Sequence, residues 1–335
     1  METVSSMTAT IMTEVQEADT TVFMLLTSIL IVALTAYDYL KVQARTTEKE
    51  MKKTSTSVVE KEAETDVHLS PSEADAIIQE KKAVLEKLLS VFPGAMSSQD
   101  VLDGFKKVVE KRGYTDDNTL FAQSVCPDEV NHEEGDITDL FAKYCGEVFH
   151  LGGLSGMPFT GKVGFGAFSH HVPDGGHCAI LYAPHIGLDS QGKFGSYTRD
   201  GQTHNGACCG AAVGAYNHCM ECDVVPELAP EPETFQFDYI VNQVAKHKNE
   251  VVGKTECDRQ ASLVRVLHRI GHNMLKRCVG LEFGDEKSTL VIITGIQINM
   301  PRPFDDYFLP LDFYIMKKDG EKEDVFEEAF GPKKC

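Results

Sequence analysis

Positive charge is scarce in this sequence. Lysine and arginine number 32 against 51 aspartate and glutamate residues, which gives a formal net charge of −19 over 335 residues. Binding to nucleic acid depends on clustered lysine and arginine that neutralise phosphates, so this composition excludes a nucleic-acid-binding role. No internal repeat is visible either. With 42% apolar residues, the length allows one large domain or two smaller ones.

Two sequence motifs are present only in part. The glycine pairs at 152–153 and 164–166 lack the full G-x-G-x-x-G pattern between a strand and a helix, so a dinucleotide site is not predicted. Cys219 and Cys222 have Cys-x-x-Cys spacing, but no second matching pair accompanies them. They leave a structural zinc or a thiol redox function as weaker alternatives.

The ten cysteines lack the even spacing of a disulfide framework. Nine of them lie between Cys126 and Cys278, beside histidines, which favours metal ligands, buried free thiols and a reducing compartment. The densest stretch, residues 168–210, holds five histidines and three cysteines around one apolar run and several glycines. Thiolates and neutral imidazoles are ligands that zinc prefers, so this stretch predicts a zinc site.

The N-terminus lacks the basic start of a signal peptide, because residues 1–19 are acidic and contain no lysine or arginine. Residues 20–37 carry no charge and would form about 27 Å of helix, enough to reach across a hydrocarbon core. The sequence predicts an acidic segment (1–19) followed by a single-pass membrane anchor or targeting helix (20–40). Basic residues after it place the C-terminal bulk on the cytosol-like side, with a plastid as one candidate. A cleaved targeting peptide on a soluble organellar protein, or a buried helix, are the alternatives.

The remainder of the chain divides into a linker and one domain. Residues 41–69 alternate charges with threonine and serine and predict a flexible linker. From residue 70 to 335, helical and strand patterns alternate, which predicts a layered α/β sheet with flanking helices. Helices are expected at 70–89, 97–113, 136–151, 208–216, 235–250 and 256–278, and strands at 119–125, 162–168, 178–182, 288–299 and 308–316.

Three candidate zinc ligands follow these elements. Cys126 comes directly after the 119–125 strand, His185 follows the 178–182 strand, and Cys209 begins a glycine- and alanine-rich segment. Open α/β sheets place ligands at the carboxyl ends of their strands, and a helix N-terminus favours a thiolate. Two thiolates and one imidazole leave a fourth position for water, as in catalytic zinc sites. Spacing alone does not choose between Cys208 and Cys209, and each ligand could instead be a buried core residue.

A charged pair could assist such a site. Two thiolates cancel the charge of zinc and make its water less acidic, so the site needs electrostatic help. Asp128 lies two residues after Cys126 and could accept a proton, and Arg199 could hold that carboxylate through two hydrogen bonds. The alternative is that Arg199 belongs to a solvated surface pair with Asp200.

Four motifs, in order, carry a family resemblance: SVCPDEVN at 124–131, AILYAPHIGLD at 179–189, SYTRDGQ at 196–202 and CCGAA at 208–212. Together they resemble the limiting-CO2-inducible protein B/C family, also called theta carbonic anhydrases, over about four fifths of the chain. The resemblance implies a beta-carbonic-anhydrase-like fold, a homodimer, zinc on Cys126, His185 and Cys209, and Asp128 with Arg199 as the gating and orienting pair.

The sequence departs from standard beta carbonic anhydrases, which have Cys-x-Asp-x-Arg and His-x-x-Cys motifs. Val130 occupies the arginine position, and 23 residues separate His185 from Cys209. The similarity is therefore to the limiting-CO2 branch of these enzymes.

The function that this resemblance implies is a zinc carbonic anhydrase that interconverts carbon dioxide and bicarbonate in inorganic-carbon acquisition. Zinc would generate hydroxide near neutral pH, and Phe121, Val125 and Leu181 would hold the uncharged substrate. The alternative is a weak or inactive zinc- and bicarbonate-binding module of the same family that acts as an interaction protein. Retention of both Asp128 and Arg199 favours catalysis.

Overall fold

The computed structural model describes residues 71–222, 225 and 233–334, and the chain from Asp75 onward forms one compact unit. The predicted acidic segment (1–19), hydrophobic helix (20–40) and linker (41–69) lie outside the described residues. Within the described ranges, no helix combines the length and the apolar character that crossing a membrane requires.

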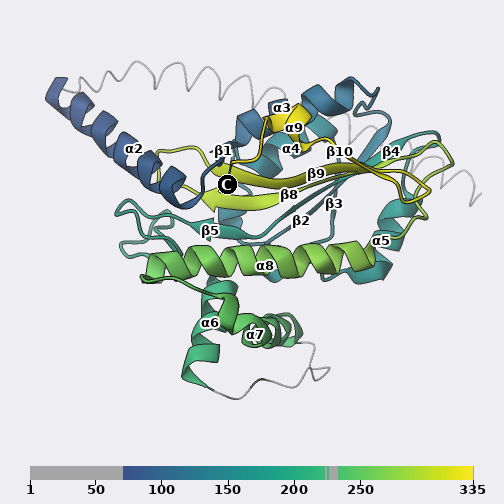
Figure 1. Ribbon diagram of the computed structural model, residues 1–335. Helices are drawn as coiled ribbons and strands as arrows, with labels where there is room; N and C mark the ends of the chain where they lie inside the picture. Colours follow the sequence, from purple (N-terminus) through teal and green to yellow (C-terminus); the bar gives the residue numbers. More distant parts are fainter. Residues whose placement is uncertain (1–70, 223–224, 226–232, 335) are drawn as a thin grey trace, which may run out of the picture. The chain divides into compact units, whose positions relative to one another are not determined.

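A central sheet organises the domain (Figure 1). Its main path has the order β1-β9-β8-β4-β2-β3. The strands on this path are β1 (Met96–Ser97), β2 (Thr119–Val125), β3 (Val148–His150), β4 (His177–Ala183), β8 (Leu290–Asn299) and β9 (Tyr307–Met316). β2, β3, β4 and β8 are parallel to one another, and β9 is antiparallel to β8. Two short strands join this sheet: β5 (His185–Gly187) on β8 and β10 (Lys322–Asp324) on β9.

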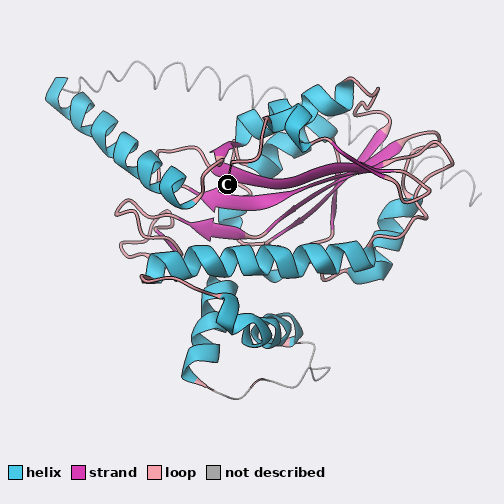
Figure 2. Cartoon of the chain, viewed as in Figure 1, coloured by secondary structure: helices cyan, strands magenta, loops and turns pink. Residues whose placement is uncertain are grey.

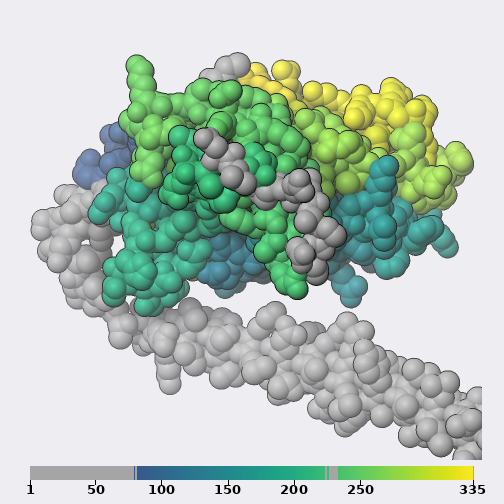
Figure 3. Space-filling view, turned by 90° about the horizontal axis from the view of Figure 1, so that it is seen from below, coloured from purple at the N-terminus to yellow at the C-terminus, as the bar shows by residue number. Residues whose placement is uncertain are grey.

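Helices cover both faces of the sheet, as Figure 2 shows. On one face lie α3 (Ser98–Glu110), α4 (Ile137–Cys145) and α9 (Phe326–Phe330). On the other lie α5 (Gly161–His170) and the long α8 (Glu256–Cys278), with α6 (Gly210–Glu221) and α7 (Phe235–His247) packed beyond α8. Figure 3 views the molecule from the side of these last helices. The C-terminal part of α2 (Pro71–Val91) packs near β5 and β8. The predicted mixed α/β fold with a central sheet and flanking helices is confirmed.

Strand β4 shows why the sheet is enclosed by helices. Ala179, Leu181 and Ala183 lie in the core shared with α3 and α4, whereas Cys178, Ile180 and Tyr182 lie in the core shared with α5 and α8. Since successive side chains of a strand point to opposite faces, a continuous apolar run packs side chains into the cores on both faces of the sheet.

Local sequence signals set several helix starts. Ser97 caps α3 by accepting a hydrogen bond from the backbone nitrogen of Asp100 at 3.1 Å. Thr255 and Asp258 form a capping box at the start of α8. The predicted helix starts at 97 and 256 are confirmed within a residue.

Two predicted elements are wrong. Residues 162–168 alternate in a way that predicts a strand, but they form α5, because Phe165 and Phe168 bury one helical face while Val163 remains 84% exposed. The helix predicted at 136–151 ends at Cys145, where Gly146 has a φ of 84°. Residues 148–150 then form β3 and extend the sheet beside β2.

Gly271 allows α8 to pack closely on β4. A Cβ atom at this position would lie 2.0 Å from the Tyr182 hydroxyl oxygen and 2.7 Å from its Cζ. Tyr182 is fully buried, and its hydroxyl donates to the carbonyls of Leu267 at 3.3 Å and His268 at 3.2 Å. The ring is therefore held both by burial and by the contacts of its hydroxyl.

We expect Gly271→Ala to lower the free energy of unfolding by about 1–3 kcal/mol through overpacking. Gly166→Ala in α5 is the matched control, because no atom lies within 4 Å of the added Cβ. Alanine is the better helix former, so the control should gain about 0.5–1 kcal/mol. Urea unfolding of the two variants measures both effects, and wild-type stability in Gly271→Ala would contradict the close packing.

Candidate metal centre

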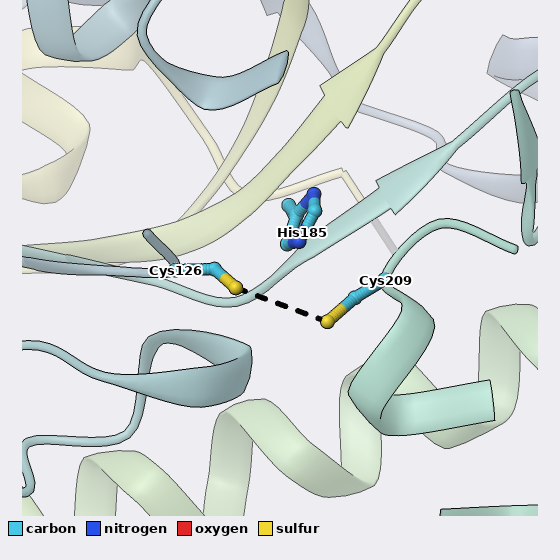
Figure 4. A group of neighbouring side chains, drawn as sticks. All are labelled: Cys126, His185 and Cys209. Carbon is cyan, nitrogen blue, oxygen red and sulfur yellow. Dashed lines mark hydrogen bonds between the residues drawn. The ribbon is translucent and has the colours of Figure 1, made fainter. Parts of the chain in front are cut away.

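The structure brings Cys126, His185 and Cys209 together from three separate elements (Figure 4). Cys126 directly follows β2, His185 opens β5, and Cys209 is the residue immediately before α6. The three side chains are buried, and their ligand atoms lie within 4.8 Å of one another. The two sulfur atoms are 4.0 Å apart.

Sheet topology explains this convergence. β2 and β4 are parallel neighbours whose register pairs Val125 with Ala183. Cys126 and His185, which follow these two residues, therefore emerge at the same edge of the sheet, as ligands do in open α/β folds. The start of α6 then adds Cys209 from the side.

The imidazole of His185 has one paired and one unpaired nitrogen. Nδ1 lies 2.8 Å from Oδ1 of Asn299, whereas Nε2 is buried and has no hydrogen-bond partner. Buried polar atoms without a partner are uncommon, and coordination of a metal would satisfy this one. Two thiols and an imidazole nitrogen are a donor set suited to zinc, so the residues fit the ion that the sequence predicts.

Protons are distributed unequally between the two thiols. The hydrogen bond to Cys209 and burial raise the pKa of Cys126, whereas the hydrogen bond from Cys126 lowers the pKa of Cys209 well below its usual value. The Ser155 hydroxyl, 3.4 Å from the Cys209 sulfur, lowers the pKa of Cys209 further. The site therefore favours a thiolate at Cys209.

Cys208 lies on another side of the histidine ring. Its sulfur is 3.6 Å from Nδ1 of His185 and 3.6 Å from Oδ1 of Asn299. Asp128, His185 and Cys208 form a second group of ligand atoms within 4.8 Å. However, Nδ1 already contacts Asn299, and Cys209 is the cysteine that shares a sulfur–sulfur contact with Cys126.

Arg199 holds Asp128 beside the three candidate ligands. Its Nη2 donates to Oδ1 of Asp128 at 3.1 Å and to Oδ2 at 3.0 Å, and its Nε donates to Oε1 of Glu129 at 2.8 Å. Oδ2 of Asp128 lies 3.9 Å from Nε2 of His185. Burial raises the pKa of Asp128, although the positive charges of His185 and Arg199 oppose that shift. The predicted contact between Asp128 and Arg199 is present, through one nitrogen, and Glu129 takes the other side of the guanidinium.

The three apolar residues expected to hold the substrate lie elsewhere. Phe121, Val125 and Leu181 pack into the core between the sheet and α3 and α4. Their strand positions direct them away from the cysteine pair, which clusters instead with Met157 and Ala212 among others. The expectation that they line the site is therefore wrong.

A buried polar network behind His185 was not predicted. It contains Asn131, Gln297, Asn299 and Asp306, all less than 9% exposed. Asn299 is the last residue of β8, so a polar residue at the carboxyl end of a predicted strand was the signal available in the sequence. Asp306 lies on the connection to β9 and had no comparable signal.

Asp136 lies close to this network and has an unusual protonation. Burial and the neighbouring Asp306 raise the pKa of Asp136 to about 8, although its carboxylate accepts a hydrogen bond from the backbone nitrogen of Glu133 at 2.9 Å. The unfolded residue has a pKa of about 3.9. Between about pH 4 and pH 8, the folded chain therefore binds one more proton at Asp136 than the unfolded chain does.

This extra proton makes the folded state less stable as the pH rises. Its stabilising contribution is complete at about pH 4 and is lost by about pH 8. We expect Asp136→Asn, which does not ionise, to remove this part of the decline. Urea midpoints at pH 5 and pH 8 measure it, and a decline as steep as that of the wild type would count against the assignment.

Cys219 and Cys222 do not form a disulfide. The cysteines of the described ranges are all free thiols. Cys219 is buried and donates to the carbonyl of Val241 at 3.5 Å, whereas Cys222 is exposed. The two side chains therefore have different surroundings and do not form a metal cluster with other described residues.

Comparison with known proteins shows the family. The sequence model of the limiting CO2-inducible proteins B/C, beta carbonic anhydrases, matches residues 95–317. The crystal structure of PtLCIB4, a homolog of the limiting CO2-inducible protein LCIB, is 30% identical, with a TM-score of 0.66 over 72% of this chain and 98% of that chain. The structure of a histidine-to-alanine mutant of PtLCIB4 is 29% identical, with the same TM-score over 72% of this chain and 97% of that chain.

A more distant structure supports the fold alone. The limiting CO2-inducible protein LCIB is 21% identical, with a TM-score of 0.55 over 71% of this chain and 96% of that chain. No curated protein matches this sequence significantly. The matched region contains Cys126, His185 and Cys209, and the chain belongs to the limiting CO2-inducible protein B/C family of beta carbonic anhydrases.

Proposed function

We propose that this protein is a zinc-dependent carbonic anhydrase that interconverts carbon dioxide and bicarbonate, with a role in inorganic-carbon acquisition. The observation that carries the proposal is the unpaired Nε2 of His185, which faces two cysteines and a carboxylate held by arginine. Membership of a beta carbonic anhydrase family supports the same reaction.

Cys126, His185 through Nε2, and Cys209 would hold the zinc ion. Cys209 is preferred to Cys208 because its sulfur contacts that of Cys126, whereas Cys208 lies beside the nitrogen that bonds Asn299. Zinc in this position supplies a Lewis acid that lowers the pKa of water. Cys126 must lose its raised-pKa proton when the metal binds, so binding is coupled to proton release.

Asp128 is the group that would handle a proton. Its Oδ2 lies 3.9 Å from Nε2 of His185, close enough to the metal position to accept a proton from a reacting water there. Arg199 keeps both carboxylate oxygens occupied and so prevents Asp128 from turning toward the metal. The partial burial of this pair strengthens the interaction relative to an exposed one.

Stopped-flow carbon dioxide hydration by residues 70–335, with metal analysis of the same sample, tests the proposal. We expect one zinc per chain and hydration that disappears when a chelator removes the metal. Full zinc content without hydration would favour a non-catalytic zinc- and bicarbonate-binding module. Absence of zinc after growth with excess zinc would reject both functions.

Membrane attachment through residues 20–40 and a homodimeric state belong to the same proposal. Each has its own test. Alkaline carbonate should leave the full-length protein in the membrane pellet if the anchor is retained, and sedimentation of residues 70–335 should give the mass of two chains.

A further inference from the structure

Two side chains contact Nδ1 of His185, and Asn299 is nearer than Cys208. Nδ1 of His185 lies 2.8 Å from Oδ1 of Asn299, and Nε2 lies on the side of Asp128, whose Oδ2 is 3.9 Å away. A metal binds the neutral form of imidazole, which has one donor nitrogen and one acceptor nitrogen. The metal requires the acceptor, so the partner of Nδ1 decides whether Nε2 is available.

The amide of Asn299 has one orientation that satisfies its surroundings. Its Nδ2 lies 2.8 Å from Oδ2 of Asp306, 2.9 Å from the carbonyl oxygen of Val130 and 3.2 Å from Oδ1 of Asn131. All three neighbours accept hydrogen bonds, so the amide nitrogen must face them and Oδ1 must face His185. Nδ1 of His185 must then carry a proton.

Asp306 is in turn held in place. Its Oδ1 accepts a hydrogen bond from the backbone nitrogen of Met300 at 2.7 Å, and its Oδ2 accepts from Nε2 of Gln297 at 3.3 Å. The residue is 8% exposed and lies on the connection between β8 and β9. A chain of oriented groups thus runs from the β8–β9 connection through Asn299 to His185.

We propose that Asp306 and Asn299 are positioning residues that keep the proton of His185 on Nδ1 and leave the lone pair of Nε2 for the metal. The inference rests on the proposed zinc site. It adds the reason why a histidine surrounded by polar groups on both sides of its ring offers one particular nitrogen.

Asp306→Asn tests this chain of groups without touching either His185 or the metal position. The amide that replaces the carboxylate can still accept from the Met300 nitrogen through Oδ1. Its new NH2 group would face Nδ2 of Asn299, and two donors cannot bond each other. Turning the Asn299 amide relieves this clash but presents a donor to Nδ1 of His185, which favours the tautomer with the proton on Nε2.

The first measurement is zinc affinity by competition with a chromophoric chelator. We expect Asp306→Asn and Asn299→Leu to bind zinc about 10–100-fold more weakly than the wild type. Thr294→Val is the matched control, because Thr294 is a buried polar residue of β8 that bonds His268, away from the site. It should lower stability and leave zinc affinity unchanged.

The second measurement is NMR of the metal-free chain labelled with 15N-histidine. We expect a slowly exchanging proton on Nδ1 of His185 in the wild type and its loss in Asn299→Leu. That result supports the inference even if the wild type binds no zinc, an outcome that would reject only the proposed function. A zinc-binding wild type whose Nδ1 carries no proton, or unchanged zinc affinity in Asp306→Asn, would overturn the inference.

Discussion

Cys126→Ser and His185→Ala are each expected to abolish tight zinc binding. The three ligand atoms converge within 4.8 Å, and the neighbouring thiol of Cys208 lies beside Nδ1 of His185. A serine hydroxyl remains protonated and is a poor ligand for zinc, while alanine leaves a buried gap. Metal analysis after dialysis should find about one zinc per wild-type chain and almost none in either variant.

Two further cysteine variants make this test specific. Cys219 is buried and free but lies outside the cluster, so Cys219→Ser should keep its zinc. Cys209→Ser should lose zinc and Cys208→Ser should retain most of it, because Cys208 contacts Nδ1 of His185. Stoichiometric zinc in Cys126→Ser or His185→Ala would remove these residues from the site, and the opposite result for Cys208 and Cys209 would exchange their roles.

The parallel core of this fold could be predicted from sequence because its signals are local. The runs at 119–125, 178–182 and 288–299 are apolar and bounded by turns, and they became β2, β4 and β8. The segment 162–168 has apolar residues that fit either a period of two or a helical spacing of three. Only the packing of Phe165 and Phe168 against the sheet decides between them, and this is tertiary information.

In the candidate site, too, local sequence signals predicted some residues, and others depend on tertiary packing. Cys126 and His185 could be placed near one another because each follows a strand, and parallel neighbours end at one edge. Ser155 contacts Cys209 and Asn299 contacts His185 although each pair lies far apart in the sequence, and Asp306 is linked to His185 through Asn299. The prediction that Phe121 lines the site was wrong for a related reason. Phe121 is close to Cys126 in the sequence, but the sequence does not show which face of β2 its side chain occupies.

Arg199→Ala is expected to lower carbon dioxide hydration at least ~100-fold while zinc stays bound, the size typical for loss of an oriented group next to a reacting centre. Arg199 bonds both oxygens of Asp128, and Oδ2 is already 3.9 Å from Nε2 of His185. Without the guanidinium, the carboxylate is free to turn toward the metal and to close the position that the reaction needs. Asp128→Ala should also keep its zinc and lose activity, because the carboxylate proposed to accept the proton is then missing.

Two controls separate this effect from a general loss of charge. Arg302 bonds Glu133 in an exposed ion pair, so Arg302→Ala removes an arginine without freeing Asp128 and should retain hydration activity. Glu129→Gln removes the charge of the second partner of Arg199 but leaves the bonds to Asp128, so its loss should be much smaller than that of Arg199→Ala. Stopped-flow hydration and zinc content are measured on the same samples. Wild-type activity in Arg199→Ala would exclude this arginine from the mechanism. Equal losses of activity in Arg199→Ala and Arg302→Ala would show that activity depends on the positive charge alone and not on the hydrogen bonds to Asp128.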